Sequence, residues 1–107
     1  MSYKLITPTE LNERLKRGEK LSLIDVREPV EFEVVRLDGA QLLPMSRFNE
    51  WIGLLDPTAE IVVICHHGIR SAQVCSYLSY QGFDKIYNMV GGLDLWAEDV
   101  DSDMPRY

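Results

Sequence analysis

The amino-acid sequence predicts an α/β domain with a mostly parallel sheet that is covered by helices on both faces. Segments rich in β-branched residues alternate with segments of helical spacing, which is typical of repeated strand–helix–strand units. The residues at 61–64 are all apolar and β-branched, as expected of a strand buried on both faces of a sheet. Because the 107-residue chain is 46% hydrophobic, we expect a single domain spanning 1–107, with a core at about 4–98 and a loose, acidic tail at 99–107.

The first third of the chain is expected to form a strand, a helix, a second strand and a short helical turn. Thr7 and Glu10 have the spacing of a capping box, and Pro8 occupies the first helical position. The expected elements are a strand at 4–6, a helix at 8–18, a strand at 21–26 and a helical turn at 29–33.

The middle of the chain is expected to add a short strand at 41–43 and a helix that begins at Ser46. This helix carries an apolar stripe that is more typical of a core than of a cofactor site, formed by Phe48, Trp51, Ile52 and Leu55. Asp56 and Pro57 are expected to end it before the strand at 61–64.

The last third of the chain is expected to form a helix at about 71–82, a strand at 85–89 and a final helix. Cys75 shares an apolar face with its helical neighbours, so we expect it to be a packing residue. Gly91 and Gly92 permit a sharp turn into the final helix, which is anchored by Leu93, Leu95 and Trp96.

A loop with chemically active residues follows the strand at 61–64. Cys65 lies where the strand ends, and a helix is expected to begin near Ser71. The first N–H groups of a helix lack internal partners and lie at the positive end of its dipole, so they stabilise an anion such as a thiolate. Gly68 permits a positive φ, which lets successive N–H groups converge. Arg70 offers paired donors to an oxyanion, and Ser71 can cap the helix or direct its hydroxyl at the sulfur.

Each of these residues also has a structural explanation. Cys65 could be one more buried apolar residue, the usual fate of a free cysteine, but the neighbouring Gly68, Arg70 and Ser71 favour a nucleophile. His66 and His67 add partial positive charge, although adjacent loop histidines are more often solvated or structural than catalytic. Since Cys65, His66 and His67 are too close in sequence to share one tetrahedral metal ion, we expect no metal, and no cofactor.

The loop resembles the active-site loop of rhodanese-type sulfurtransferases through seven consecutive residues, namely Cys65, His66, His67, Gly68, Ile69, Arg70 and Ser71. Other segments resemble further signatures of that family in the family's order: Asp25-Val26-Arg27-Glu28 with Glu31-Phe32, then Gly39-Ala40 with Pro44, then Gly82-Phe83, and finally Gly91-Gly92-Leu93 with Trp96. The resemblance spans about residues 21–97. It implies a single rhodanese domain with a five-stranded, mostly parallel sheet flanked by helices, and with the cysteine loop at the carboxyl ends of the strands.

Asp25 and Arg27 follow the predicted strand at 21–26. An aspartate at the carboxyl end of a strand can face an active site. We nevertheless expect a structural ion pair, since buried opposite charges support a fold without taking part in chemistry. The resemblance likewise assigns these two residues mainly to support.

The chain departs from the family pattern at 35–37, where rhodanese-like chains commonly have Gly-His-Ile. The valine at position 35 resists positive φ, which indicates a different backbone. Some rhodaneses hold an inorganic sulfur donor with an arginine a few residues beyond the Asp-x-Arg signature. Glu31 occupies that neighbourhood here, so Arg36 is the candidate for the role.

The resemblance implies a two-step transfer of sulfane sulfur. Cys65 as a thiolate would attack a small anionic donor such as thiosulfate, release sulfite and hold the sulfur as a persulfide. Cyanide, a thiol or a protein cysteine would then accept it. The cationic loop favours thiosulfate over mercaptopyruvate as the donor. Backbone N–H groups would stabilise the persulfide anion, while Arg70 would hold the donor or brace the loop.

Three other functions fit parts of the same pattern. A phosphatase or arsenate reductase also surrounds an oxyanion with a cysteine and an arginine, but phosphatases of this architecture have five residues between them, whereas four separate Cys65 from Arg70. A non-catalytic binding or sensing module usually lacks the cysteine. A persulfide carrier for one dedicated protein is also compatible with the sequence.

Composition and charge argue against nucleic acid and membranes as partners. A net charge of −6 and a pI near 4.8 argue against nucleic acid, which needs concentrated positive charge. There is neither an apolar run long enough to span a membrane nor a signal-peptide core at the start. Two cysteines are too few for a disulfide framework, so we expect a cytoplasmic monomer with a free, reactive thiol.

Overall fold

The computed structural model describes residues 2–107 and contains a five-stranded sheet in which all paired strands are parallel. The strand order is β1-β5-β4-β2-β3, which places β4 at the centre. The strands are β1 (Lys4–Ile6), β2 (Ser22–Asp25), β3 (Gln41–Leu42), β4 (Ile61–Ile64) and β5 (Ile86–Met89). The predicted fold class is therefore confirmed, and the sheet is wholly rather than mostly parallel.

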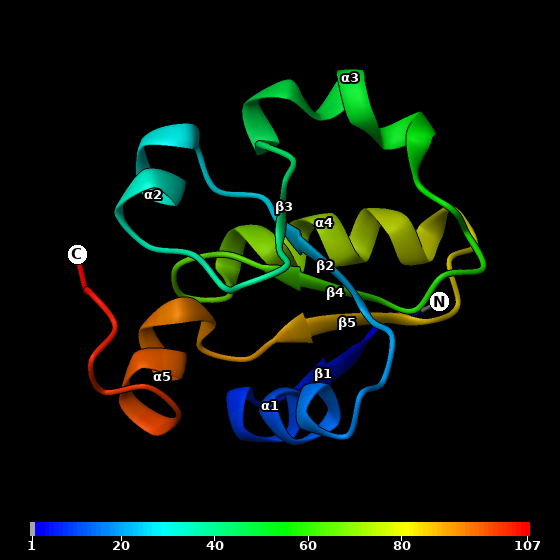
Figure 1. Ribbon diagram of the computed structural model, residues 1–107. Coiled ribbons are helices and arrows are strands. Elements are labelled where there is room, and N and C mark those ends of the chain that lie inside the picture. The colour runs from blue at the N-terminus through cyan, green and yellow to red at the C-terminus, as the bar shows by residue number, and fades with distance from the viewer. Residues whose placement is uncertain (1) are drawn as a thin grey trace.

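Helices cover both faces of this sheet. They are α1 (Pro8–Lys16), α2 (Pro29–Val34), α3 (Phe48–Trp51), α4 (Ile69–Tyr80) and α5 (Gly92–Asp99). Figure 1 shows α1 and α5 together on one side of the sheet and α3 and α4 on the other, while α2 lies near the carboxyl ends of the strands. Among residues 2–107, no helix combines the length and the apolar character needed to cross a membrane.

The central strand β4 divides the core into two layers because successive side chains of a strand point to opposite faces. Ile61 and Val63 pack in the layer beneath α3 and α4, and Cys65 continues this alternation into the same layer. Val62 and Ile64 pack on the other side, with residues of α1 and α5. The face on which Cys65 lies thus follows from the register of β4.

The local signals that begin α1 are present as predicted. The Thr7 hydroxyl accepts the N–H of Glu10 at 3.1 Å, and the Glu10 carboxylate accepts the N–H of Thr7 at 2.9 Å. This reciprocal capping box satisfies two N–H groups that the first turn would otherwise leave unpaired.

The helix predicted from Ser46 is not one continuous α-helix. It is divided into a 3₁₀ turn at Met45–Arg47, the single turn α3, and a second 3₁₀ turn at Ile52–Leu54. Ser46 does not cap it, because its N–H and its hydroxyl both donate to the Glu28 carboxylate. The aromatic residues still pack as expected, with Phe48 edge-on to Trp51 at 5.1 Å between ring centroids.

Candidate active site

The segment that follows β4 places a sulfur atom at the start of a helix. The Cys65 Sγ accepts the N–H of Gly68 at 3.0 Å and that of Ser71 at 3.4 Å, and it lies 3.2 Å from the Ser71 hydroxyl oxygen. Cys65 is nevertheless buried, with 1% of its surface exposed, and borders the apolar core. The sulfur therefore combines the burial of a core cysteine with converging N–H donors that a core cysteine lacks.

Gly68 sets the geometry of this loop. It is the N-cap residue of α4, with φ at +93°, a backbone conformation that residues other than glycine rarely adopt. The helix begins at Ile69, two residues earlier than predicted, so Ser71 lies within its first turn and does not cap it. The Ser71 hydroxyl points instead towards the sulfur, the other arrangement that the sequence allows.

A residue that the sequence analysis did not single out fixes the Ser71 hydroxyl. Ser71 donates its hydroxyl proton to Asn88 Oδ1 at 2.5 Å, and Asn88 Nδ2 donates to the Gly68 carbonyl at 3.1 Å. Asn88 thus holds the Ser71 hydroxyl in place beside the Cys65 sulfur. The sequence signal that could have indicated Asn88 is a polar amide in β5, next to the central strand, where the structure buries it.

The start of α5 is hydrogen-bonded to the backbone of the same loop. The N–H groups of Leu93 and Asp94 donate to the carbonyls of Cys65 and His66 at 2.9 and 3.0 Å. A Cβ atom at Gly92 would lie 2.4 to 2.5 Å from these carbonyl groups, so only glycine allows this approach. The loop is thus fixed between two helix starts.

Arg70 is committed to an ion pair with α2. Its two terminal nitrogens donate to the two carboxylate oxygens of Glu31 at 2.7 and 2.8 Å. The Arg70 guanidinium lowers the pKa of Glu31 to about 2, and Glu31 in turn raises the pKa of Arg70. Of the two roles considered for Arg70, this geometry is that of a brace.

Asp25 and Arg27 form a completely buried ion pair. Arg27 Nε and Nη2 lie 2.7 to 3.1 Å from the Asp25 carboxylate oxygens, and both side chains are 0% exposed. Arg27 Nη2 also donates to the Val35 carbonyl at 2.6 Å. Val35 is extended, with φ at −162°, as expected of a position that avoids positive φ. The pair therefore ties the end of β2 to the segment after α2.

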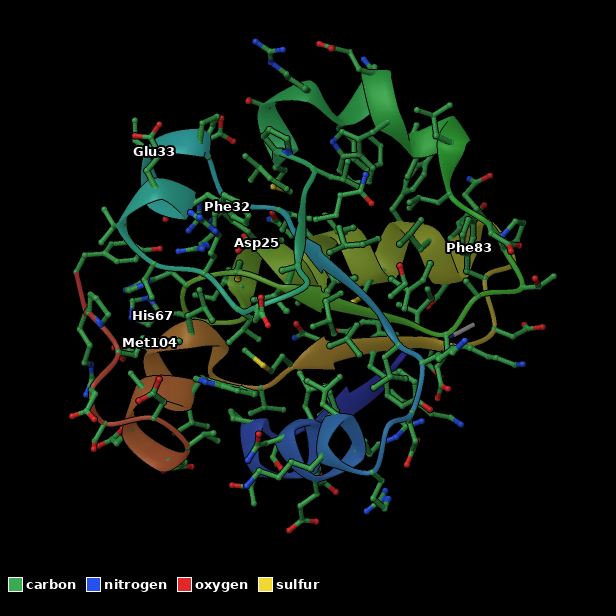
Figure 2. The ribbon with its side chains drawn as sticks, in the orientation of Figure 1. Asp25, Phe32, Glu33, His67, Phe83 and Met104 are labelled. Atoms are coloured by element: carbon green, nitrogen blue, oxygen red, sulfur yellow. The ribbon has the colours of Figure 1, made fainter. Side chains whose placement is uncertain are left out.

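Arg36 is engaged on α2 and not at Cys65. Its Nη1 donates to the Phe32 carbonyl at 3.1 Å, and its guanidinium lies 5.0 Å from the centroid of the Phe32 ring. The expectation that Arg36 holds a donor at the loop finds no contact to support it among the described residues. Figure 2 shows Asp25, Phe32 and His67 at the same end of the sheet, with Phe83 at the opposite end.

The two histidines differ in environment. His66 is half-buried, and its Nδ1 is buried without a hydrogen-bond partner among residues 2–107. Burial, followed by the neighbouring His67, lowers the pKa of His66, which disfavours the charged form of this ring. This direction opposes the expectation that His66 adds partial positive charge to the loop. His67 is exposed, with Nε2 3.7 Å from the Asp94 carboxylate.

The residues after α5 are not the loose tail that the sequence predicts. Arg106 pairs with Asp94 at 2.7 Å, and the Tyr107 ring lies against His66 with 4.1 Å between centroids. The Tyr107 hydroxyl accepts from Arg27 at 2.8 Å and donates to Glu31 at 2.9 Å. Such contacts between residues so distant in sequence leave no local pattern from which to predict them.

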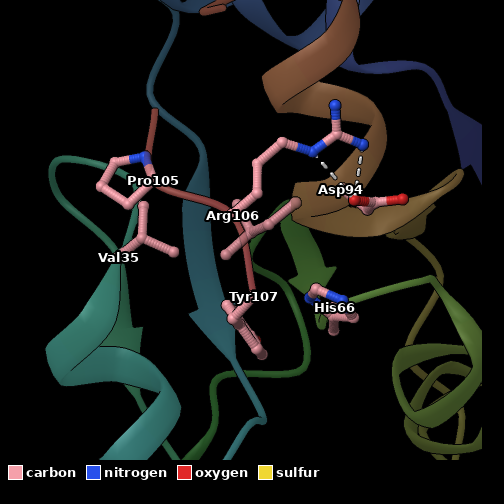
Figure 3. Close-up of a pocket in the computed structure, with 7 residues that line it drawn as sticks. Val35, His66, Asp94, Pro105, Arg106 and Tyr107 are labelled. Atoms are coloured by element: carbon pink, nitrogen blue, oxygen red, sulfur yellow. Dashed lines mark hydrogen bonds and ion pairs between the residues drawn. The ribbon is translucent and has the colours of Figure 1, made fainter. Parts of the chain in front are cut away.

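The tail leaves little space above the loop. Figure 3 shows the cavity between His66, Asp94 and the tail residues Pro105, Arg106 and Tyr107. Its volume is about 10 Å³, enough for roughly one water molecule. A substrate that approached from this side would have to displace the tail.

One group of side chains could approach a metal ion. Among residues 2–107, His66, His67 and Asp94 each place one potential ligand atom within 4.8 Å of the others. Asp94 Oδ1 is already paired with Arg106, whose positive charge would oppose a cation. No sequence pattern links Asp94 to the two histidines, because it lies on α5 and not on the loop.

Comparison with known proteins adds independent information. A family model described as a rhodanese-like domain matches residues 7–99. Over 97 residues the chain is 34% identical to the thiosulfate sulfurtransferase GlpE of Haemophilus influenzae, covering 91% of this chain and 90% of that protein. It is 42% identical over 104 residues to the probable adenylyltransferase/sulfurtransferase MoeZ of Mycobacterium tuberculosis, but it spans only 26% of that longer protein. The crystal structure of a rhodanese-related protein from Thermoplasma volcanium superimposes with a TM-score of 0.82 at 32% identity, covering 92% of this chain and 94% of the other.

Proposed function

Since this chain belongs to the rhodanese-like domain family, we propose that it is an enzyme that transfers sulfane sulfur through a persulfide on Cys65. The observation that carries the proposal is the contact of one sulfur with the N–H groups of Gly68 and Ser71 at the start of α4. Donors fixed in this way stabilise a sulfur anion without reorganising during the reaction. The similarity to GlpE supports thiosulfate as one donor that the enzyme accepts.

The reaction follows from these contacts in two displacements. In the first, the Cys65 thiolate attacks the outer sulfur of thiosulfate, a new S–S bond forms, and the original S–S bond breaks with its electron pair leaving on sulfite. In the second, an acceptor such as cyanide, a thiol or a protein cysteine attacks the outer sulfur, and the Cys65 thiolate is released. The N–H groups of Gly68 and Ser71 hold the negative charge in both states.

Ser71 and Asn88 are positioning residues for this cycle. Asn88 fixes the Ser71 hydroxyl, which lies 3.2 Å from the sulfur, and the carbonyl of Gly68, the residue whose N–H donates to the sulfur.

Steady-state kinetics test the proposal. With thiosulfate as donor and cyanide as acceptor, the covalent intermediate predicts thiocyanate formation with ping-pong kinetics. Cys65→Ser is expected to abolish turnover, while the matched variant Cys75→Ser retains it. A folded wild-type protein that forms no thiocyanate with any sulfane donor, and leaves a phosphate ester equally untouched, would point to a binding module instead.

The state of both cysteines supports the proposed compartment. Cys65 and Cys75 are free thiols, which suits a reducing environment, so we propose that the protein works in the cytoplasm. We also propose that it is a monomer. Size-exclusion chromatography with light scattering tests the monomer directly, and a dimer mass would contradict it.

A further inference from the structure

The ion pair between Glu31 and Arg70 bears on the choice of sulfur donor. We infer that Glu31 is a specificity-determining residue, which disfavours doubly charged inorganic donors and favours sulfane-sulfur donors of lower negative charge, such as thiosulfonates and persulfides. The inference rests on the proposed sulfur transfer at Cys65.

Glu31 is paired with Arg70, the cation that an anionic donor would otherwise bind. Both terminal nitrogens of Arg70 are bound to the Glu31 carboxylate, at 2.7 and 2.8 Å. Glu31 is 18% exposed and is held further by the Tyr107 hydroxyl at 2.9 Å and the Glu28 N–H at 3.0 Å. A carboxylate fixed by three different residues competes strongly with an incoming sulfonate, because its geometry is already matched to the guanidinium.

The other cations around the loop are matched in the same way. Arg27 is buried against Asp25, and Arg106 is paired with Asp94. Burial lowers the pKa of His66 and so disfavours its charged form. Among residues 2–107, Arg27, Arg70 and Arg106 are each paired with a carboxylate, while Arg36 is engaged by the Phe32 carbonyl. Since the whole chain carries a net charge of −6, a dianion that approaches the loop meets little free positive charge to offset it.

Arg70 lies next to the residue that binds the sulfur. It directly precedes Ser71, whose N–H donates to Cys65 Sγ at 3.4 Å in the first turn of α4. An Arg70 released from Glu31 would therefore act on a donor bound at the sulfur. With Glu31 in place, the N–H groups of Gly68 and Ser71 are the donors left for substrate charge.

Two donors with the same reactive sulfur separate this effect from the chemistry. Thiosulfate is a dianion and leaves as sulfite, whereas benzenethiosulfonate is a monoanion and leaves as benzenesulfinate. In each reaction the Cys65 thiolate attacks the outer sulfur, the S–S bond breaks, and its electron pair departs with the leaving group, so the persulfide formed is the same. A difference in kcat/KM between the two donors therefore reflects their charge and size at the donor site.

The test compares kcat/KM for the two donors in Glu31→Gln and in a matched control. Glu60 is a suitable control because it also pairs with an arginine and a tyrosine hydroxyl, Arg14 and Tyr87, both at 2.8 Å. It is 28% exposed and directly precedes β4, at the opposite end of the strand from Cys65. Glu60→Gln therefore makes the same chemical change to the net charge away from the loop.

We expect Glu31→Gln to raise kcat/KM for thiosulfate about tenfold and that for benzenethiosulfonate less than about threefold. Glu60→Gln should leave the ratio of the two donors unchanged. The double variant Glu31→Gln with Arg70→Gln should lose the gain, because no cation is left to release. These three results together support the inference.

Several outcomes would overturn it. An unchanged donor ratio in Glu31→Gln, or a parallel fall for both donors, would make Glu31 a structural brace only. A thiosulfate gain that persists in the double variant would show that Arg70 is not the group involved. Sulfur transfer that survives in Cys65→Ser would instead remove the proposed function itself, so the two failures are distinguishable.

Discussion

Of the residues described, Arg27 has the largest fully buried side chain, and its replacement by methionine should destabilise the fold strongly. Methionine fills a similar volume, but it leaves the Asp25 carboxylate buried with the backbone N–H of residue 27 as its remaining donor. Removing one partner of a buried ion pair costs about 3 to 5 kcal/mol. The Val35 carbonyl, which loses its donor at 2.6 Å, adds to this cost.

Urea denaturation followed by circular dichroism and tryptophan fluorescence measures the loss. A domain of this size has a total stability of about 5 to 15 kcal/mol, so Arg27→Met should lose a large fraction of it. Arg14→Met is the matched control, because Arg14 also pairs with carboxylates but is 21% exposed, and its loss should stay below about 1 kcal/mol.

The double variant Asp25→Asn with Arg27→Met separates charge from packing. Because no buried charge remains, it should recover about half or more of the stability lost in Arg27→Met. A loss in Arg27→Met no larger than that in Arg14→Met, or a double variant less stable than Arg27→Met, would refute the reasoning.

Three further predictions concern the loop and its surroundings. Cys75→Ser should cost about 1 to 2 kcal/mol of unfolding free energy in urea denaturation, because it buries a hydroxyl. The variant should still load sulfur fully, since burial raises the pKa of the Cys75 thiol to about 12 and so makes it a poor nucleophile. Loss of loading in the folded variant would refute the assignment of Cys75 as a packing residue. The ion pair of Glu31 is fully stabilising above the ordinary carboxyl pKa and is lost as the pH falls towards about 2. The difference in unfolding free energy between wild type and Glu31→Gln should therefore shrink by about 2 to 3 kcal/mol between about pH 5 and pH 2, and a difference independent of pH would contradict the lowered pKa. Tyr107→Ala should uncover the loop and speed alkylation of Cys65 by iodoacetamide roughly fivefold, whereas an unchanged rate would mean that the tail does not limit access.

Local sequence signals were sufficient for most of the fold. The β-branched run of β4, the capping box at Thr7 and Glu10, and the glycine at position 68 each depend on neighbours within a few residues. Their physical causes are side-chain alternation, reciprocal capping and the freedom of glycine at positive φ. These same causes placed the N–H groups of the loop around the sulfur of Cys65.

Tertiary contacts determine what the sequence could not predict. Glu28 accepts the hydroxyl hydrogen bond of Ser46, 18 residues away in sequence, and so prevents Ser46 from capping a helix. Glu31 holds Arg70 across 39 residues, and Tyr107 contacts Glu31 across 76. Such pairs depend on the assembled sheet, since no periodicity or spacing in the chain brings them together.

The central claim is that Cys65 carries the transferred sulfur, and mass spectrometry after incubation with thiosulfate tests it most directly. Wild type should gain one sulfur atom, located on the peptide that contains Cys65, and cyanide should remove it. A protein that gains no mass, or that holds the sulfur on the peptide containing Cys75, would contradict the claim.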